Sequence, residues 1–153
     1  MNRLRKLTGI AILVAVIGCG SSAPGDAEGT DTMGEVSGVG SMLVRYGDAA
    51  SPVDLATQSS LVIQGQTMVR LSDVVAASHL SVDLSAVVAG FRGADGFDPA
   101  TKPTCIDVFP MSGERLQQGY VILATRNLWW DEELGYPGCI HVSDCAEIIL
   151  SNP

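Results

Sequence analysis

Basic side chains are scarce in this sequence, which has 9 Lys and Arg against 17 Asp and Glu among its 153 residues. Three of the nine lie within residues 1–18, and the other six are scattered singly along the chain. A protein that binds nucleic acid needs several basic groups close together to neutralise phosphates. The sequence therefore predicts no nucleic-acid partner.

Recognisable catalytic motifs are also lacking. The chain has no CxxC pair, no phosphate-binding glycine loop and no HExxH, and its two histidines, His79 and His141, belong to no evident Ser/His/Asp set. These motifs carry most of the chemistry that can be read from sequence alone. We therefore expect a binding domain rather than an enzyme, and no bound cofactor.

Long apolar runs are confined to one place near the beginning of the chain. Arg3, Arg5 and Lys6 precede the uncharged run 7–17, which is shorter than the roughly 20 residues needed to span a bilayer. A basic start followed by a short apolar run is typical of an export signal. We predict a signal peptide over residues 1–18.

The apolar run ends in Val16-Ile17-Gly18-Cys19, and this pattern resembles the lipobox of bacterial lipoproteins. The resemblance implies cleavage before Cys19 and acylation of its thiol, which anchors the chain permanently in a membrane when several acyl chains are attached. An ordinary signal peptide that is cut a few residues later is the alternative. By resemblance to enterobacterial lipoproteins, Gly20 after the acylated cysteine favours the outer membrane.

Removal of residues 1–18 leaves six basic and seventeen acidic side chains, a formal charge of −11. Residues 19–38 then begin the chain with the acylated cysteine and a Gly-rich, acidic segment. Such a composition buries too little apolar surface to offset the entropy of ordering. We predict a flexible linker over 19–38 and one compact domain over 39–153.

Apolar periodicity within residues 39–153 predicts an α+β domain dominated by strands. One helix is expected over Leu71–Leu80, with Ser72 as its N-cap, Asp73 in the first turn and one buried face. Its expected buried side chains are Leu71, Val74, Val75 and Ser78. The expected strands are 42–46, 61–63, 87–91, 120–124, 140–142 and 148–150, with short helical turns around 113–118 and 143–146.

A tight turn is expected at Gly93–Pro99 because Asp95-Gly96 provides a residue that tolerates positive φ. Asp95 and Asp98 could instead hold a cation, but the loop lacks the further oxygen ligands that calcium requires.

Several short motifs resemble the molybdopterin-binding domain of sulfite oxidases. They are the helix entry at 65–75, the turn Ala94–Phe97, the strand Gln118–Ala124 and the C-terminal stretch Gly138–Leu150, so that the likeness covers roughly residues 60–150. The resemblance implies a related fold and, as the alternative function, an oxidoreductase whose pterin-bound molybdenum is ligated by Cys105. The cysteine motif and the Arg-rich phosphate site of that family are missing, so the scaffold is expected without the chemistry.

Cys105, Cys139 and Cys145 remain once Cys19 is acylated, and an oxidising envelope favours a disulfide between two of them. We predict a Cys105–Cys139 bridge with Cys145 buried, and Cys139–Cys145 is the alternative. A zinc site formed by these cysteines and His141 is a further alternative, although the spacing matches no common zinc motif. His79, near the end of the predicted helix, is expected to interact with the helix dipole.

Trp129, Trp130 and Asp131 begin the densest aromatic and acidic cluster of the chain. Adjacent residues in a strand point to opposite faces, so one tryptophan is expected in the core. The other could form a surface for a ligand, with Asp131 beside it as a hydrogen-bond acceptor.

These features together predict a membrane-tethered, non-catalytic domain of the cell envelope that binds a small ligand or an envelope protein. The boundary between linker and domain can be tested by limited proteolysis with a protease of broad specificity. We expect the first cleavages within residues 20–38, because a segment without packed structure is cut first. Intact-mass spectrometry locates the cuts, and initial cleavage within 60–150 would show that the boundary is misplaced.

Overall fold

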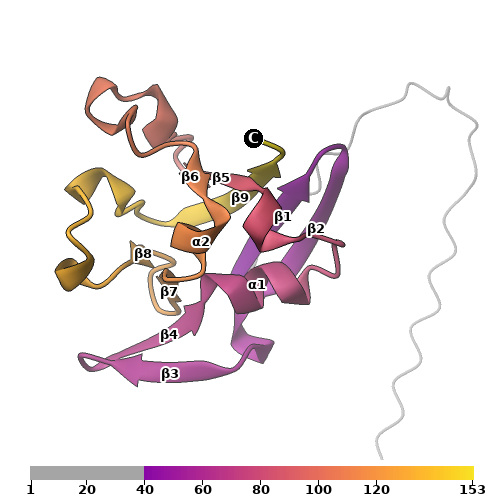
Figure 1. Cartoon of the computed structure of the whole chain (residues 1–153). Coiled ribbons are helices and arrows are strands. Elements are labelled where there is room, and N and C mark those ends of the chain that lie inside the picture. The colour runs from indigo at the N-terminus through magenta and orange to yellow at the C-terminus, as the bar shows by residue number, and fades with distance from the viewer. Residues whose placement is uncertain (1–39) are drawn as a thin grey trace, which may run out of the picture. The chain divides into compact units, whose positions relative to one another are not determined.

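The computed structural model describes residues 40–153, which form an α+β domain of two β-sheets and two short α-helices within that range (Figure 1). The strand-dominated class expected from the sequence is confirmed. The predicted signal peptide, Cys19 and linker lie outside the described residues. The strands are β1 (Ser41–Tyr46), β2 (Ala49–Asp54), β3 (Ser60–Ile63), β4 (Gln66–Arg70), β5 (Val88–Gly93), β6 (Met111–Ser112), β7 (Tyr120–Ile122), β8 (Leu128–Trp129) and β9 (Cys145–Ser151).

The helices are α1 (Leu71–Ala77) and α2 (Gly113–Leu116), and six 3₁₀ turns connect the other elements of residues 40–153. These turns are η1 (Leu55–Thr57), η2 (Leu84–Ala86), η3 (Pro99–Thr101), η4 (Pro103–Cys105), η5 (Glu132–Leu134) and η6 (Gly138–Ile140). Four of them, η1, η2, η3 and η5, begin after an aspartate whose carboxylate accepts a hydrogen bond from the backbone of the turn. Local Asp capping therefore organises much of the connecting structure.

The strands form a five-stranded sheet in the order β2-β1-β9-β5-β6 and a four-stranded sheet in the order β3-β4-β7-β8. Within the larger sheet β1 and β9 are parallel, and the other pairs are antiparallel. Strand β9 thus joins the N-terminal hairpin β1–β2 to the β5–β6 pair. The smaller sheet is antiparallel throughout.

Five of the six strands expected from periodicity are present as β1, β3, β5, β7 and β9. The sixth, expected over 140–142, is wrong: the turn η6 ends at Ile140, and Val142 instead accepts a backbone hydrogen bond from Leu128 (2.9 Å). The helical turn expected over 143–146 is also wrong. Asp144 has a left-handed backbone (φ 44°), stabilised where its N–H donates to the Asn127 side chain, and β9 begins at once with Cys145.

Helix α1 buries Leu71, Val74 and Val75, and Ser78 just after it is also buried, as the periodicity predicts. The predicted cap at Ser72 is wrong, because β4 leads directly into the helix and Arg70 is the N-cap residue without a side-chain capping bond. The helix is also shorter than expected. It ends at Ala77, where the Ser78 hydroxyl donates to the Val75 carbonyl (2.6 Å).

A shared carboxylate joins the three central strands of the larger sheet. Glu147 on β9 accepts hydrogen bonds from Arg45 on β1 and from Arg92 on β5 (3.2 Å to Nη1). The Glu147 side chain is only 8% exposed, whereas the side chains of Arg45 and Arg92 are 42% and 51% exposed. A buried carboxylate is costly unless it is paired, and the two arginines supply that pairing from the strands on either side of β9.

Trp130 lies at the centre of the core between the two sheets. It follows β8 of the smaller sheet, and its ring meets Phe91 of β5 edge-on at 5.9 Å between centroids. Its indole N–H donates to the Arg115 carbonyl of α2 (3.0 Å). Gly119 makes room for this indole, because a Cβ there would lie 2.5 Å from Trp130 Cε2 and 2.7 Å from Leu71 Cδ1.

The Gly119→Ala substitution should therefore destabilise the domain. Overpacking of a filled core costs roughly 1–3 kcal/mol, and neither Trp130 nor Leu71 has free space to move into, since both are at most 1% exposed. The free energy of unfolding, measured by urea denaturation, reports the loss. Gly138→Ala is the matched control, because a Cβ at Gly138 meets no atom within 4 Å; equal stability of the two variants would contradict this account of the core.

Candidate functional site

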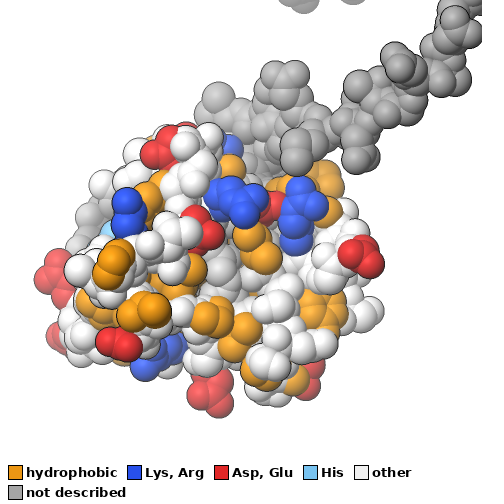
Figure 2. All heavy atoms as spheres, turned by 90° about the horizontal axis from the view of Figure 1, so that it is seen from above, with side chains coloured by type: hydrophobic (Ala, Val, Ile, Leu, Met, Phe, Trp, Pro, Cys, Tyr) orange, Lys and Arg blue, Asp and Glu red, His pale blue; other side chains and the backbone are white. Residues whose placement is uncertain are grey.

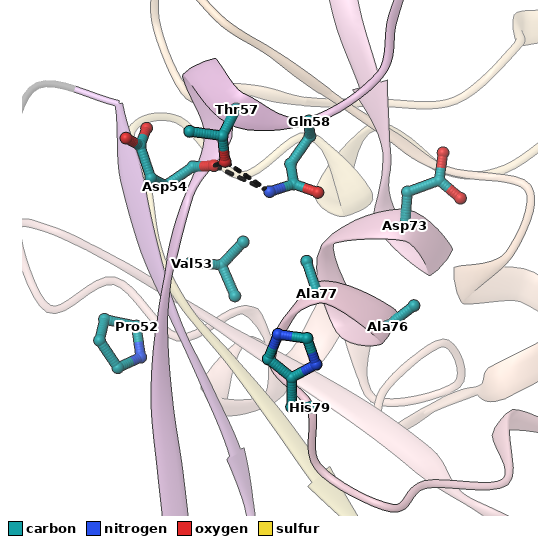
Figure 3. Close-up of a pocket in the computed structure, with 9 residues that line it drawn as sticks. All are labelled: Pro52, Val53, Asp54, Thr57, Gln58, Asp73, Ala76, Ala77 and His79. Atoms are coloured by element: carbon teal, nitrogen blue, oxygen red, sulfur yellow. Dashed lines mark hydrogen bonds between the residues drawn. The ribbon is translucent and has the colours of Figure 1, made fainter.

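A cavity of about 500 Å³ opens between the end of β2, the turn η1 and helix α1 (Figure 3). Its walls combine short apolar side chains with carboxylate, amide, hydroxyl and imidazole groups. The lining residues are Pro52, Val53, Asp54, Thr57, Gln58, Asp73, Ala76, Ala77 and His79. This size lies within the usual range for small-ligand sites, roughly 300–1,000 Å³.

The β2 side of the cavity is built by the aspartate that ends the strand. One carboxylate oxygen of Asp54 accepts the N–H of Ala56 (2.9 Å) and so begins η1. The backbone carbonyl of Asp54 accepts the Thr57 hydroxyl (2.8 Å) and the Gln58 amide nitrogen (3.1 Å). The turn therefore holds the side chains of Thr57 and Gln58 at the cavity, whereas the Asp54 carboxylate points away from it (Figure 3).

The helix side of the cavity follows from the amphipathic pattern of α1. Leu71, Val74 and Val75 face the core, which leaves Asp73, Ala76 and Ala77 to line the cavity. His79 comes after the last turn in a left-handed conformation (φ 57°). In Figure 3 its imidazole stands below Ala77 and faces the space in front of Val53.

The lining is acidic and contains no pair of groups arranged for nucleophilic catalysis. Asp54 and Asp73 are its carboxylates, and neither Lys nor Arg lines the cavity. Thr57 is the one hydroxyl of the lining, and it donates to the Asp54 carbonyl rather than to His79. This geometry can bind a ligand but does not activate a nucleophile, which needs a neighbouring base within hydrogen-bond reach.

The predicted ligand surface at Trp129–Asp131 is divided by the structure. Trp130 is 1% exposed and belongs to the core, as expected for one of the two tryptophans. Trp129 is half-buried and packs against Tyr120 (5.7 Å between centroids). Asp131 is exposed, and its carboxylate caps η5 through the N–H of Glu133 (3.0 Å). None of the three lines the cavity.

The predicted Cys105–Cys139 bridge is not formed in the structure, where Cys105, Cys139 and Cys145 are free thiols. Cys105 and Cys139 nevertheless lie on neighbouring turns, η4 and η6, and the Cys139 thiol points to the Thr104 carbonyl (3.9 Å). Burial, with a further contribution from the Cys105 thiol, raises the pKa of Cys139 to about 11. Burial raises the pKa of Cys145 to about 12, and its thiol donates to the Glu147 carbonyl (3.5 Å).

The alternative metal sites find no support among residues 40–153. No three His, Cys, Asp or Glu side chains in that range lie close enough together to hold a metal ion. The cysteines and His141 considered as zinc ligands are therefore not brought together. The carboxylate of Asp95 accepts the N–H of Phe97 (2.9 Å), and that of Asp98 accepts the N–H of Ala100 (2.9 Å). These two carboxylates stabilise the predicted turn, in which Gly96 has the expected positive φ (81°).

The molybdopterin cofactor implied by the resemblance does not fit the surroundings of Cys105. The Cys105 side chain is buried and does not line the cavity. The polar groups beside its thiol are the Thr104 hydroxyl (3.8 Å) and the Cys139 thiol, whereas a pterin phosphate needs basic groups. The residues present therefore do not form that site.

No sequence pattern predicts the cavity, because its polar residues come from separate segments. An aspartate followed by a short polar turn at Asp54 does predict a capped turn. It does not predict that α1 lies opposite.

Comparisons with family models, with curated proteins and with solved structures found no match. Among the described residues, no helix has the length and apolar character needed to cross a membrane.

The cysteine arrangement can be tested by oxidation of the native protein. We expect non-reducing peptide mapping to link Cys105 to Cys139, because their turns are neighbours, and Cys145 to remain a free thiol. Alkylation of the reduced native protein at pH 8 should label little, since only a thiolate reacts and the pKa values of Cys139 and Cys145 are about 11 and 12. A mapped Cys139–Cys145 link would contradict the expected pairing.

Proposed function

We propose that this chain is a lipoprotein of the bacterial cell envelope whose domain binds a small ligand or a partner without catalysing a reaction. The anchor rests on the lipobox pattern at Val16–Cys19 and on the short apolar run before it. Gly20 favours the outer membrane as the site of attachment. The acyl group at Cys19 is then the contact with the membrane.

The observation that carries the binding function is the cavity between β2 and α1. Two of its polar side chains, Thr57 and Gln58, are held in place by hydrogen bonds to the Asp54 carbonyl, so these two need little further ordering when a ligand binds. The apolar side chains of Ala76 and Ala77, which are not fully buried, add surface that a ligand can cover. The cavity is open to solvent and has more polar lining than most small-ligand sites, so a ligand bound there would stay partly exposed.

The distribution of charge supports the absence of a nucleic-acid partner. The described domain carries six basic and thirteen acidic side chains. On the face in Figure 2 the basic side chains form small separate groups instead of a continuous patch. Three of the six basic side chains, those of Arg45, Arg92 and Arg126, are paired with carboxylates.

The Cys19→Ala substitution tests the anchor. We expect the variant to move from the membrane fraction to the soluble fraction, because loss of the acylated thiol removes the proposed attachment. The melting temperature of the domain should stay unchanged, since Cys19 is outside the packed residues 40–153. Ser21→Ala, in the same segment, should remain with the membrane. A Cys19→Ala protein that still sediments with membranes after a salt wash would overturn the lipoprotein proposal.

A further inference from the structure

Strand β3, at the edge of the smaller sheet, turns backbone groups away from the rest of that sheet (Figure 1). Val62 lies opposite Thr67 of β4, and the Thr67 carbonyl accepts the N–H of Leu123 on the β7 side (3.0 Å). Opposite residues of an antiparallel pair exchange both of their backbone hydrogen bonds or neither. The N–H and C=O of Val62 therefore face away from β4, and by the same alternation so do those of Ser60.

The other sheet edges within residues 40–153 have features that discourage pairing with a further strand. Strand β2 contains Pro52 and ends in Asp54, and β6 and β8 are each two residues long. Prolines, charges and short strands are common means of preventing edge-to-edge association. Strand β3 lacks such protection, because residues 55–69 contain no Pro, Asp, Glu, Lys, Arg or His. Among the described strands, β3 therefore offers the open edge.

The side chains of β3 are apolar where a further strand would lie. Val62 is 71% exposed. Leu61 and Ile63 are half-buried on the opposite face of the sheet, and Leu61 lies across from the buried Met68 of β4. A further strand with aliphatic side chains would cover Leu61 on one face and Val62 on the other.

A second copy of β3 meets these requirements. Two copies that run antiparallel about a two-fold axis can place Ser60 of each opposite Val62 of the other, so that the outward backbone groups of both residues pair. Leu61 then lies on the axis, opposite Leu61 of the second copy. The described domain carries six basic and thirteen acidic side chains, a formal charge of −7, so two copies repel each other over most of their surface. The uncharged edge brings no like charges together.

We propose that β3 pairs with β3 of a second copy and joins the two smaller sheets into one continuous antiparallel sheet. This inference goes beyond the proposed binding function and does not depend on it, because no residue of β3 lines the cavity. The paired segment is short, so the dimer is weak in dilute solution. Attachment of both copies to one membrane raises their effective concentration and favours the dimer.

Disulfide cross-linking of the full-length protein in membrane vesicles tests this pairing. The Leu61→Cys variant places two thiols on the proposed axis, where non-hydrogen-bonded residues have Cα atoms about 4.5 Å apart, within the range that a disulfide spans. We expect mild oxidation to give a linked dimer on a non-reducing gel, and peptide mapping to show a link between the two introduced cysteines. The wild-type protein, with its own Cys105, Cys139 and Cys145, gives the background.

Two further cysteine variants separate pairing from random collision. Val62→Cys carries the more exposed thiol. The two copies of residue 62, however, are diagonal neighbours about 7–8 Å apart, which is too far for a disulfide. Ile106→Cys is matched to it in exposure, because Ile106 is 67% exposed and lies outside both sheets. Both variants should link more slowly than Leu61→Cys, and equal or faster linking of either would indicate collision and overturn the proposal.

A charge on the edge should remove the cross-link. Val62→Lys in the Leu61→Cys background places two like charges at the interface, so we expect loss of the linked dimer. The melting temperature should stay that of the Leu61→Cys protein, because the side chain of residue 62 is largely exposed. Ile106→Lys in the same background is the matched control and should keep the dimer. A self-link that persists with Val62→Lys, or a link formed only with a different protein, would overturn the pairing of two copies.

Discussion

Close packing of the Trp130 indole against the backbone of Gly119 is the constraint on which the arrangement of the domain depends. The indole reaches Phe91 of the larger sheet, while Trp130 itself follows β8 of the smaller sheet. Its N–H satisfies a carbonyl of α2, and the Gly119 carbonyl accepts the N–H of Leu71 at the start of α1 (3.0 Å). One side chain and one glycine thus set the positions of both sheets and both helices. The cavity depends on them indirectly, because they fix the start of α1.

Much of the fold could be predicted from local patterns. Met42 and Val44 alternate with more exposed neighbours in β1, and the buried face of α1 follows the helical period. Strand β2 could not be predicted in this way, because its residues do not alternate between apolar and polar and include Pro52. A proline is tolerated within β2 because this strand lies at the edge of the larger sheet. The misassigned region around residues 140–146 depends on contacts with Asn127 and Leu128, which are distant in sequence from the residues that they order.

The candidate site was less accessible to prediction than the fold. Asp54 and Asp73 are ordinary capping and first-turn residues when each is considered alone. Only the packing of α1 opposite η1 makes them two walls of one space. The aromatic cluster gave a stronger signal in the sequence, yet burial of Trp130 follows from its place in the core rather than from a ligand. Residues with a distinctive composition are therefore not always the residues that form a cavity.

The place of β9 within the larger sheet has a consequence for the timing of assembly. Cys145–Ser151 lies between β1 and β5 in that sheet, although it follows all the other strands of residues 40–153 in sequence. The residues of the β1–β2 hairpin and of the β5–β6 pair all precede the strand that joins them, so they leave the ribosome before it does. Glu147 likewise reaches Arg45 across a separation of 102 residues. The larger sheet therefore cannot close until the last strand of the chain is present, and the earliest strands must wait for it.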